Sequence, residues 1–221
     1  MNDVSPIITI DGPTASGKGT IASGVAGVLG FNYLDSGALY RLAALQSVRE
    51  RVDPNDDAAL GAMARCLPIC FDTKKIQLNG EDVTDAIRTE SIGNLASQIA
   101  RGAGLRQGLL DLQRAFAKPP GLVADGRDMG TVVFPTARFK VFLTASAEVR
   151  AERRYKQLIE KGFSVKFVDL LQNLQERDAR DSSRAFAPLV PAAGAWILDS
   201  TDKGIDDVVA GIVDRYRCAE V

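Results

Sequence analysis

Residues 10–20 read Ile-Asp-Gly-Pro-Thr-Ala-Ser-Gly-Lys-Gly-Thr, a glycine-rich stretch near the start of the chain. The run that leads into it, Ile7-Ile8-Thr9-Ile10, is β-branched throughout and predicts a buried strand. The residues after it place apolar side chains at a helical spacing, at Ile21, Val25, Val28 and Leu29. A strand, then Gly12-x-x-x-x-Gly17-Lys18, then a helix is the phosphate-binding P-loop in the context that the motif requires. The alternative, a glycine-rich turn with a chance lysine, does not account for the two flanking elements.

The chemistry of this stretch suits the phosphates of a nucleotide. Gly12 and Gly17 let the backbone curl so that successive N–H groups point at phosphate oxygens. The N-terminus of the following helix adds unpaired N–H groups and the positive end of its dipole, and Lys18 supplies a positive charge for the β- and γ-phosphates. We therefore predict that ATP contacts the whole loop, which comprises Gly12, Pro13, Thr14, Ala15, Ser16, Gly17, Lys18, Gly19 and Thr20.

The residue after Lys18 is Gly19, so the hydroxyl that usually ligates Mg²⁺ directly is displaced by one position, to Thr20. The form Gly-Lys-Gly-Thr resembles nucleoside monophosphate kinases, in which the metal is held more by phosphates and water. It argues against a GTPase site, and the chain also lacks the Asn-Lys pair that such a site needs for guanine.

The composition excludes several classes of function. The chain has 221 residues, of which 46% are hydrophobic and 25% are charged, and its net charge of −1 predicts no bulk attraction to nucleic acid or to an anionic membrane. It has no histidine, which excludes Ser-His and Cys-His nucleophilic catalysis and histidine-ligated metals. Arginine outnumbers lysine, which fits recognition of an anionic substrate.

The three cysteines give no metal site. Cys66 and Cys70 have no second pair to complete a tetrahedral site, so we expect these two and Cys218 to be buried, reduced thiols. No apolar run reaches the length of a membrane span, and the N-terminus lacks a basic signal region. The sequence therefore predicts a cytoplasmic protein with neither nucleic acid nor membrane as a partner.

Strands alternate with helices along most of the chain, which predicts an α/β fold with a parallel central sheet between layers of helices. The expected strands are 7–10, 31–34, 122–125, 139–143 and 196–199, and the expected helices after the first begin near 36, 89, 104, 147, 165 and 205. Ser36 and Ser146 are the expected N-caps of two of these helices. Residues 52–88 are rich in Asp and turn signals around two strand-like runs, 69–71 and 76–78, and predict a small β-rich insertion.

Three groups of charged residues point to phosphate chemistry. Asp125 ends a strand, where ligands bind in parallel sheets, and could order water on Mg²⁺; Arg127 and Asp128 follow it, which a simple Asp-Gly turn does not explain. Arg150, Arg153 and Arg154 share one helix face, although a solvated face paired with Glu148 and Glu152 is equally compatible.

The third group lies on the helix expected over 165–184. There an apolar stripe at Phe167, Leu170, Leu171 and Leu174 continues as Arg177, Asp181 and Arg184. The change from leucine to charge along one line predicts that the far end of the helix faces a binding cleft. The alternative is a helix end that emerges into water.

With these residues in view, the chain resembles the bacterial cytidylate kinase family from end to end. The most specific stretch is Ala124-Asp-Gly-Arg-Asp-Met-Gly-Thr131. The others include Thr9-Ile-Asp-Gly-Pro13, Gly17-Lys-Gly-Thr20, Leu34-Asp-Ser-Gly-Ala-Leu-Tyr-Arg41, Ile87-Arg-Thr-Glu90, Ala96-Ser-Gln98, Gln113-Arg-Ala-Phe116, Glu160-Lys-Gly-Phe-Ser164, Glu176-Arg-Asp178, Ala187-Pro-Leu-Val-Pro191 and Leu198-Asp-Ser-Thr201.

The resemblance implies a single P-loop NTPase domain that transfers the γ-phosphoryl group of ATP to CMP or dCMP, with Mg²⁺ as cofactor. It implies a core at about 1–35, 117–150 and 185–221, a nucleoside-monophosphate-binding region with its insertion at about 36–116, and a short lid with the following helix at about 150–184. A monomer is expected.

The family's site residues carry over to matching positions. The resemblance places Ser36 and Arg41 at the acceptor ribose and phosphate, and Arg127 at the acceptor phosphate. It places Ser97, Arg106, Asp128 and Arg184 around cytosine, and Arg177 with Asp181 at the sugar hydroxyls. It implies that Lys18, Arg127, Arg150, Arg153 and Arg154 act on the transferred group, while Thr20 and Asp125 hold Mg²⁺ indirectly through water.

Two alternatives to a CMP kinase remain. One is another small P-loop kinase, acting on UMP, shikimate or gluconate. The other is a nucleotide-binding regulator that does not turn over.

Overall fold

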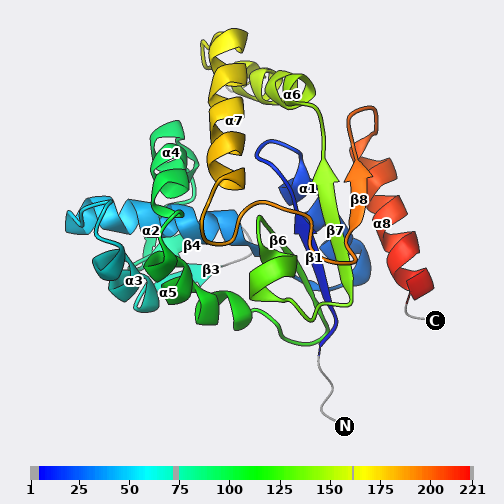
Figure 1. The fold of residues 1–221 in the computed structure, drawn as a ribbon, viewed down its shortest axis with the longest axis horizontal. Helices are drawn as coiled ribbons and strands as arrows, with labels where there is room; N and C mark the ends of the chain where they lie inside the picture. The colour runs from blue at the N-terminus through cyan, green and yellow to red at the C-terminus, as the bar shows by residue number, and fades with distance from the viewer. Residues whose placement is uncertain (1–4, 72–74, 161, 220–221) are drawn as a thin grey trace. The chain divides into compact units, whose positions relative to one another are not determined.

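The computed structural model describes residues 5–71, 75–160 and 162–219 (Figure 1). Its internal contacts divide the chain into two compact units. The first, called the P-loop unit below, combines the chain up to Leu34 with the chain from Phe116 onward. The second, called the middle unit, is Asp35–Ala115.

The P-loop unit is built on the predicted parallel sheet, which the structure confirms. Its strands are β1 (Ile7–Asp11), β2 (Asn32–Asp35), β6 (Leu122–Gly126), β7 (Phe139–Thr144) and β8 (Trp196–Asp199). They lie in the order β2-β6-β1-β7-β8, and β1 pairs in parallel with both β6 and β7. The inner strands β1 and β6 are buried along almost their whole length, because a parallel sheet is covered on both faces.

Helices α1 (Lys18–Leu29) and α8 (Ile205–Ala219) lie side by side against one face of this sheet (Figure 1). Ile21 and Val25 of α1 and Ile212 of α8 pack with Ile8 and Ile10 of β1 in one core. Val28 was predicted to belong to the apolar face of α1, but it is exposed. The buried stripe instead uses small residues, Ala22 and Ala26, which let α1 approach the sheet closely.

Helices α6 (Ala147–Glu160) and α7 (Phe167–Ser182) pack on each other at the edge to which the strand arrows point (Figure 1). Ser146 N-caps α6 as predicted, since its Oγ accepts a hydrogen bond from Val149 N at 3.2 Å. A short helical turn, η2 (Met129–Val133), follows β6.

The middle unit is mostly helical and contains the predicted small sheet. Its helices are α2 (Ser36–Glu50), α3 (Asp57–Arg65), α4 (Glu90–Ile99) and α5 (Ala103–Arg114), with a short turn η1 (Ala86–Arg88). The antiparallel strands β3 (Ile69–Phe71), β4 (Ile76–Leu78) and β5 (Glu81–Asp82) form the sheet. The prediction of a β-rich segment over 52–88 missed α3, which Asp56 caps by accepting a hydrogen bond from Ala59 N.

Helices α3 and α5 pack at very short range because glycines line their contact. A Cβ added at Gly61 would lie 2.7 Å from the Gly104 carbonyl oxygen, and one at Gly108 would lie 2.5 Å from the Gly61 carbonyl oxygen. The carboxylate of Asp57 accepts hydrogen bonds from Gly104 N at 2.7 Å and Leu105 N at 3.1 Å. This residue of α3 thereby fixes the N-terminus of α5.

Two other expectations are wrong. Asp35, rather than Ser36, caps α2, because its Oδ1 accepts a hydrogen bond from Ala38 N at 3.0 Å and Ser36 is already the first helical residue. Cys66, Cys70 and Cys218 are exposed rather than buried, since they lie at the end of α3, on the small sheet and in the last turn of α8. Among the described residues, no helix combines the length and the apolar character that crossing a bilayer requires.

Candidate functional site

The P-loop has the backbone geometry of an anion cradle. Gly12 lies under β7, where an added Cβ would come within 2.1 Å of the Leu143 carbonyl oxygen. Ala15 and Gly17 adopt left-handed conformations, with φ of 58° and 85°, and Gly17, the N-cap residue of α1, has no side chain that could cap the helix. The N–H groups at the N-terminus of a helix are a typical binding site for an anion. The Lys18 ammonium lies over the loop and donates to the Pro13 carbonyl at 3.1 Å.

A buried carboxylate lies beside the start of α1. Asp125, near the end of β6, accepts a hydrogen bond from the Tyr33 hydroxyl at 3.2 Å. A Cβ added at Gly19 would lie 3.2 Å from Asp125 Oδ2, so the second residue of α1 faces this oxygen directly. Thr20, the displaced hydroxyl, is exposed.

These donors fit a magnesium ion held mainly by phosphates and water. Mg²⁺ typically takes one or two carboxylates and keeps several waters, and Asp125 supplies one carboxylate close to the P-loop. The described residues contain no group of three or more histidine, cysteine or acidic side chains placed to hold a metal by themselves.

A second carboxylate, Asp11, was missed by the sequence analysis. It ends β1 and accepts hydrogen bonds from Met129 N and Gly130 N, both at 2.8 Å, and so fixes the loop that follows Asp128. Burial raises the pKa of Asp11 to about 6, although these two hydrogen bonds oppose the change. Its only sequence signal was its place directly after a buried strand.

Asp181 lies at the centre of a buried charge cluster. The Arg127 Nε donates to its Oδ2 at 2.8 Å, and Arg184 donates to its Oδ1. Asp181 is 1% exposed. Burial acts to raise the pKa of Asp181, but the charges of Arg127, Arg184 and Arg177 outweigh it and the pKa is lowered. The carboxylate is thus kept ionised between guanidinium groups.

This cluster tests the alternative in which the far end of α7 emerges into water. The leucine end of the helix is the less buried one, since Phe167 is exposed and Leu170 and Leu171 are only half-buried. The charged end holds buried Asp181, followed by buried Arg184. The alternative of a helix end emerging into water is therefore wrong.

Asp128 is buried at the start of η2. Its main-chain oxygen accepts hydrogen bonds from Val132 N at 2.9 Å and Val133 N at 3.1 Å. Asp11 also accepts hydrogen bonds from Met129 N and Gly130 N, the next two residues. These bonds together fix the backbone that follows Arg127 and Asp128.

The three arginines of α6 do not share one environment. Arg150 is buried, whereas Arg153 donates to the Ser200 carbonyl at 2.6 Å and Arg154 donates to Gln157 Oε1 at 2.7 Å. Glu152 forms an exposed ion pair with Lys156. The burial of Arg150 contradicts the alternative of a solvated face for that residue.

The middle unit carries the remaining predicted residues. Arg41 donates to the Ile87 carbonyl at 2.8 Å, and the absence of a side chain at Gly93 leaves room for its guanidinium. Arg106 is buried and donates to the Ala100 carbonyl at 2.7 Å.

Tyr40, which the sequence analysis missed, also contacts Arg106. Its hydroxyl accepts a hydrogen bond from Arg106 at 3.3 Å, and the guanidinium lies 5.4 Å from its ring centroid. Ser36 and Ser97 are buried, and within the described part of the chain the Ser97 hydroxyl has no hydrogen-bond partner. A buried hydroxyl in that state suits a bond to a ligand.

Comparison with known proteins identifies the family. The family model described as Cytidylate kinase matches residues 8–218. The chain belongs to the cytidylate kinase family. A cytidylate kinase of Bordetella bronchiseptica is 56% identical over 213 residues, which cover 96% of each chain. One of Burkholderia thailandensis is 60% identical over 213 residues, covering 96% of this chain and 93% of its own.

A solved structure supports the fold. An uncharacterized protein from Eubacterium ventriosum superimposes with a TM-score of 0.50 at 13% identity, over 97% of this chain and 99% of its own. At that identity the likeness concerns the fold alone.

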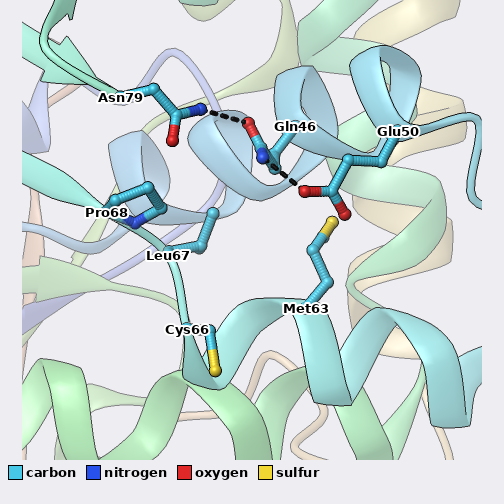
Figure 2. Close-up of a pocket in the computed structure, with 7 residues that line it drawn as sticks. All are labelled: Gln46, Glu50, Met63, Cys66, Leu67, Pro68 and Asn79. Carbon is cyan, nitrogen blue, oxygen red and sulfur yellow. Dashed lines mark hydrogen bonds between the residues drawn. The ribbon is translucent and has the colours of Figure 1, made fainter.

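One cavity of the middle unit lies apart from the residues that the family resemblance names. It has a volume of about 300 Å³ and is lined by Gln46, Glu50, Met63, Cys66, Leu67, Pro68 and Asn79. Figure 2 shows Gln46 between Asn79, which donates to it at 3.1 Å, and Glu50, which accepts from it at 2.6 Å. None of the predicted site residues lines it.

Within the P-loop unit, the structure brings together Arg127, Asp181 and Arg184, with Arg177 close enough to act on the Asp181 carboxylate. Within the middle unit, Arg41 and Arg106 are each held by main-chain carbonyls. The contacts of all these residues with substrates stay predictions.

Proposed function

We propose that this chain is a Mg²⁺-dependent kinase that transfers the γ-phosphoryl group of ATP to CMP or dCMP, giving ADP and CDP or dCDP. The observation that carries the proposal is the family match over residues 8–218, which includes both the P-loop and the Arg127-Asp128 dipeptide with its buried Asp128. We further propose that the enzyme acts as a monomer in the cytoplasm.

The donor ATP would lie on the P-loop. Its N–H groups and the N-terminus of α1 would bind the phosphates, and Lys18 would place a charge at the β- and γ-phosphates. Arg153 and Arg154 of α6 would add positive charge on the donor side. Thr20 and Asp125 would hold Mg²⁺ through water, and the ion would supply charge that neutralises the phosphate oxygens during transfer.

The acceptor phosphate would bind Arg127 and Arg41. Asp181 is ionised and Arg177 is close to it, so the pair offers an acceptor and donors for the sugar hydroxyls. Ser36 would meet the ribose. The buried charges around Asp181 are already ordered before a nucleotide binds, which lowers the entropy cost of binding.

The base would be read by Asp128, Arg106, Ser97 and Arg184. Cytosine offers an amino donor at C4 and an unprotonated acceptor at N3, whereas uracil offers the opposite at both positions. An ionised Asp128 can accept from the cytosine amino group but repels the uracil oxygen, and Arg106 has only donors for N3. Selection would therefore use both attraction and repulsion.

The chemistry needs no covalent intermediate. Both substrates carry anionic phosphates, so the chain's main tasks are to bring them into line and to neutralise the charge that spreads over the transferred group. Exclusion of water by the lid region would prevent loss of the γ-phosphoryl group to hydrolysis.

An ADP-release assay with ATP and a panel of CMP, dCMP, UMP, AMP, shikimate and gluconate tests the proposal. We expect turnover with CMP and dCMP well above that with UMP and AMP. Turnover with shikimate or gluconate instead would identify a different small kinase. ATP binding without ADP release on any acceptor would indicate a non-catalytic regulator.

A further inference from the structure

Arg150 is a buried arginine whose guanidinium is occupied by three groups of the protein. Its Nε donates to the Ala145 carbonyl at 3.0 Å, its Nη1 to the Thr14 carbonyl at 3.1 Å, and its Nη2 to Asp178 Oδ2 at 2.6 Å. The residue is only 5% exposed. One side chain of α6 therefore links the P-loop, at Thr14, to α7, at Asp178.

The bond to Thr14 sets the orientation of a peptide in the P-loop. In a trans peptide the carbonyl and the following N–H point in opposite directions. When Arg150 holds the Thr14 carbonyl on its own side, the Ala15 N–H is directed away from Arg150. The same bond keeps a carbonyl oxygen from turning toward the phosphates, which it would repel.

This peptide needs external support. Ala15 has a φ of 58°, a left-handed conformation that is unfavourable for a residue with a Cβ. Such conformations persist where the surroundings determine them. Arg150 supplies a charged hydrogen bond at the peptide immediately before Ala15.

Asp178 fixes Arg150 in turn. The ion pair is largely buried, with the two side chains 6% and 24% exposed. The second carboxylate oxygen, Oδ1, is buried, and the described residues provide it with no hydrogen-bond partner. The main specific bond of this carboxylate is thus the one to Arg150.

We propose that Arg150 and Asp178 are positioning residues for the donor nucleotide: Asp178 holds Arg150, and Arg150 holds the Thr14–Ala15 peptide in the conformation that binds the ATP phosphates. This gives Arg150 a role different from direct contact with the transferred group. The inference rests on the proposed function only in that the P-loop binds ATP.

Calorimetric titration with ATP and steady-state kinetics test this on Asp178→Asn, Arg150→Met, Arg150→Lys and the double variant. Glu152→Gln, which removes the carboxylate of the exposed pair with Lys156 on the same helix, is the matched control. A hydrogen bond to a charged group changes an equilibrium constant by about tenfold when lost. We expect Arg150→Met to raise the Kd for ATP by about tenfold and Asp178→Asn by somewhat less.

The pattern across substrates and variants separates positioning from a general structural role. We expect the KM for CMP to change less than about twofold in these variants. The ATP affinity of Arg150→Lys should lie between those of the wild type and Arg150→Met, because lysine can reach only some of the three partners. The double variant should bind ATP no more weakly than Arg150→Met. Glu152→Gln should match the wild type.

Three results would overturn the proposal. An unchanged ATP affinity with a reduced kcat in Arg150→Met would place Arg150 at the transferred group. Equal losses for ATP and CMP would indicate a structural role, and an unchanged Asp178→Asn would remove Asp178 from the mechanism. Asp178→Asn is isosteric, so it decides the question even if Arg150→Met does not fold. If the wild-type chain binds ATP but fails to phosphorylate CMP, the proposed function is contradicted. The comparison of ATP affinities among the Arg150 and Asp178 variants still tests the positioning role in that case.

Discussion

Replacement of Asp181 by asparagine removes the charge at the centre of the cluster formed by Arg127 and Arg184. Asp181 is 1% exposed, and the side chains of Arg184 and Arg127 are 4% and 16% exposed, so water compensates neither guanidinium fully. Breaking a buried ion pair by removing one partner costs about 3–5 kcal/mol. The amide retains one acceptor but turns a donor toward a guanidinium, so we expect the free energy of unfolding to fall by about 3–5 kcal/mol.

Urea unfolding, monitored by the fluorescence of Trp196, measures this free energy of unfolding. The probe is suitable because Trp196 is the single tryptophan and lies on β8, in the same unit as Asp181. Asp169→Asn, at an exposed position in the first turn of α7, is the matched control and should leave the midpoint unchanged. The KM values for CMP and dCMP should both rise, since both acceptors share the sugar hydroxyl assigned to Asp181.

The pH dependence gives a second test of the same residue. Because the pKa of Asp181 is lowered in the folded chain, its contribution to stability is present above the ordinary carboxyl pKa of 3.8 and is lost as the pH falls through the lowered value. The stability gap between wild type and Asp181→Asn should therefore shrink below about pH 4. A gap below about 1 kcal/mol at neutral pH, or one that does not change in acid, would refute the assignment of a buried ionised carboxylate.

Three further predictions address other parts of the site. Lys18→Ala should retain its circular dichroism spectrum but fall below a few per cent of the wild-type kcat, the loss typical of a major electrostatic contact; higher residual activity would remove Lys18 from phosphoryl transfer. Asp128→Ala should lower kcat/KM for CMP by an amount that corresponds to about 1–3 kcal/mol, and should change kcat/KM for UMP much less. An equal loss for both nucleotides would mean that Asp128 supports the loop rather than reading the base. Burial raises the pKa of Asp11 to about 6, so the folded chain binds this proton more tightly than the unfolded chain. The contribution of Asp11 to the free energy of unfolding is fully present below about pH 4 and is lost as the pH rises through 6. The total loss is about 3 kcal/mol. Urea unfolding between about pH 4 and 6 should show that the free energy of unfolding of the wild type falls relative to that of Asp11→Asn. A constant difference between the two free energies would contradict the raised pKa of Asp11.

Local patterns predicted the elements whose signals lie within a few residues of one another. The β-branched run of β1 and Ser146 at the start of α6 both have short-range causes. The same short range explains the error at α3. The Asp run before it indicated a turn, but Asp56 uses its side chain to cap a helix, and both behaviours favour the same residue type.

Contacts between residues that lie far apart in the sequence could not be predicted from local patterns. Asp11 binds the main chain of Met129 and Gly130, which lie 118 and 119 residues away, and no local pattern encodes that contact. The contact between Arg106 and Tyr40 could not be predicted for the same reason, since the two lie 66 positions apart in the sequence. The position of Asp125, by contrast, was predictable because it lies near the end of a buried strand.

The central claim is that the chain transfers the γ-phosphoryl group to the phosphate of CMP. Incubation with γ-labelled ATP and CMP, followed by separation of the nucleotides, tests it directly. The proposed function predicts that the label appears in CDP, that its appearance requires CMP, and that little is released as inorganic phosphate. Label found in inorganic phosphate, with CMP unchanged, would contradict it.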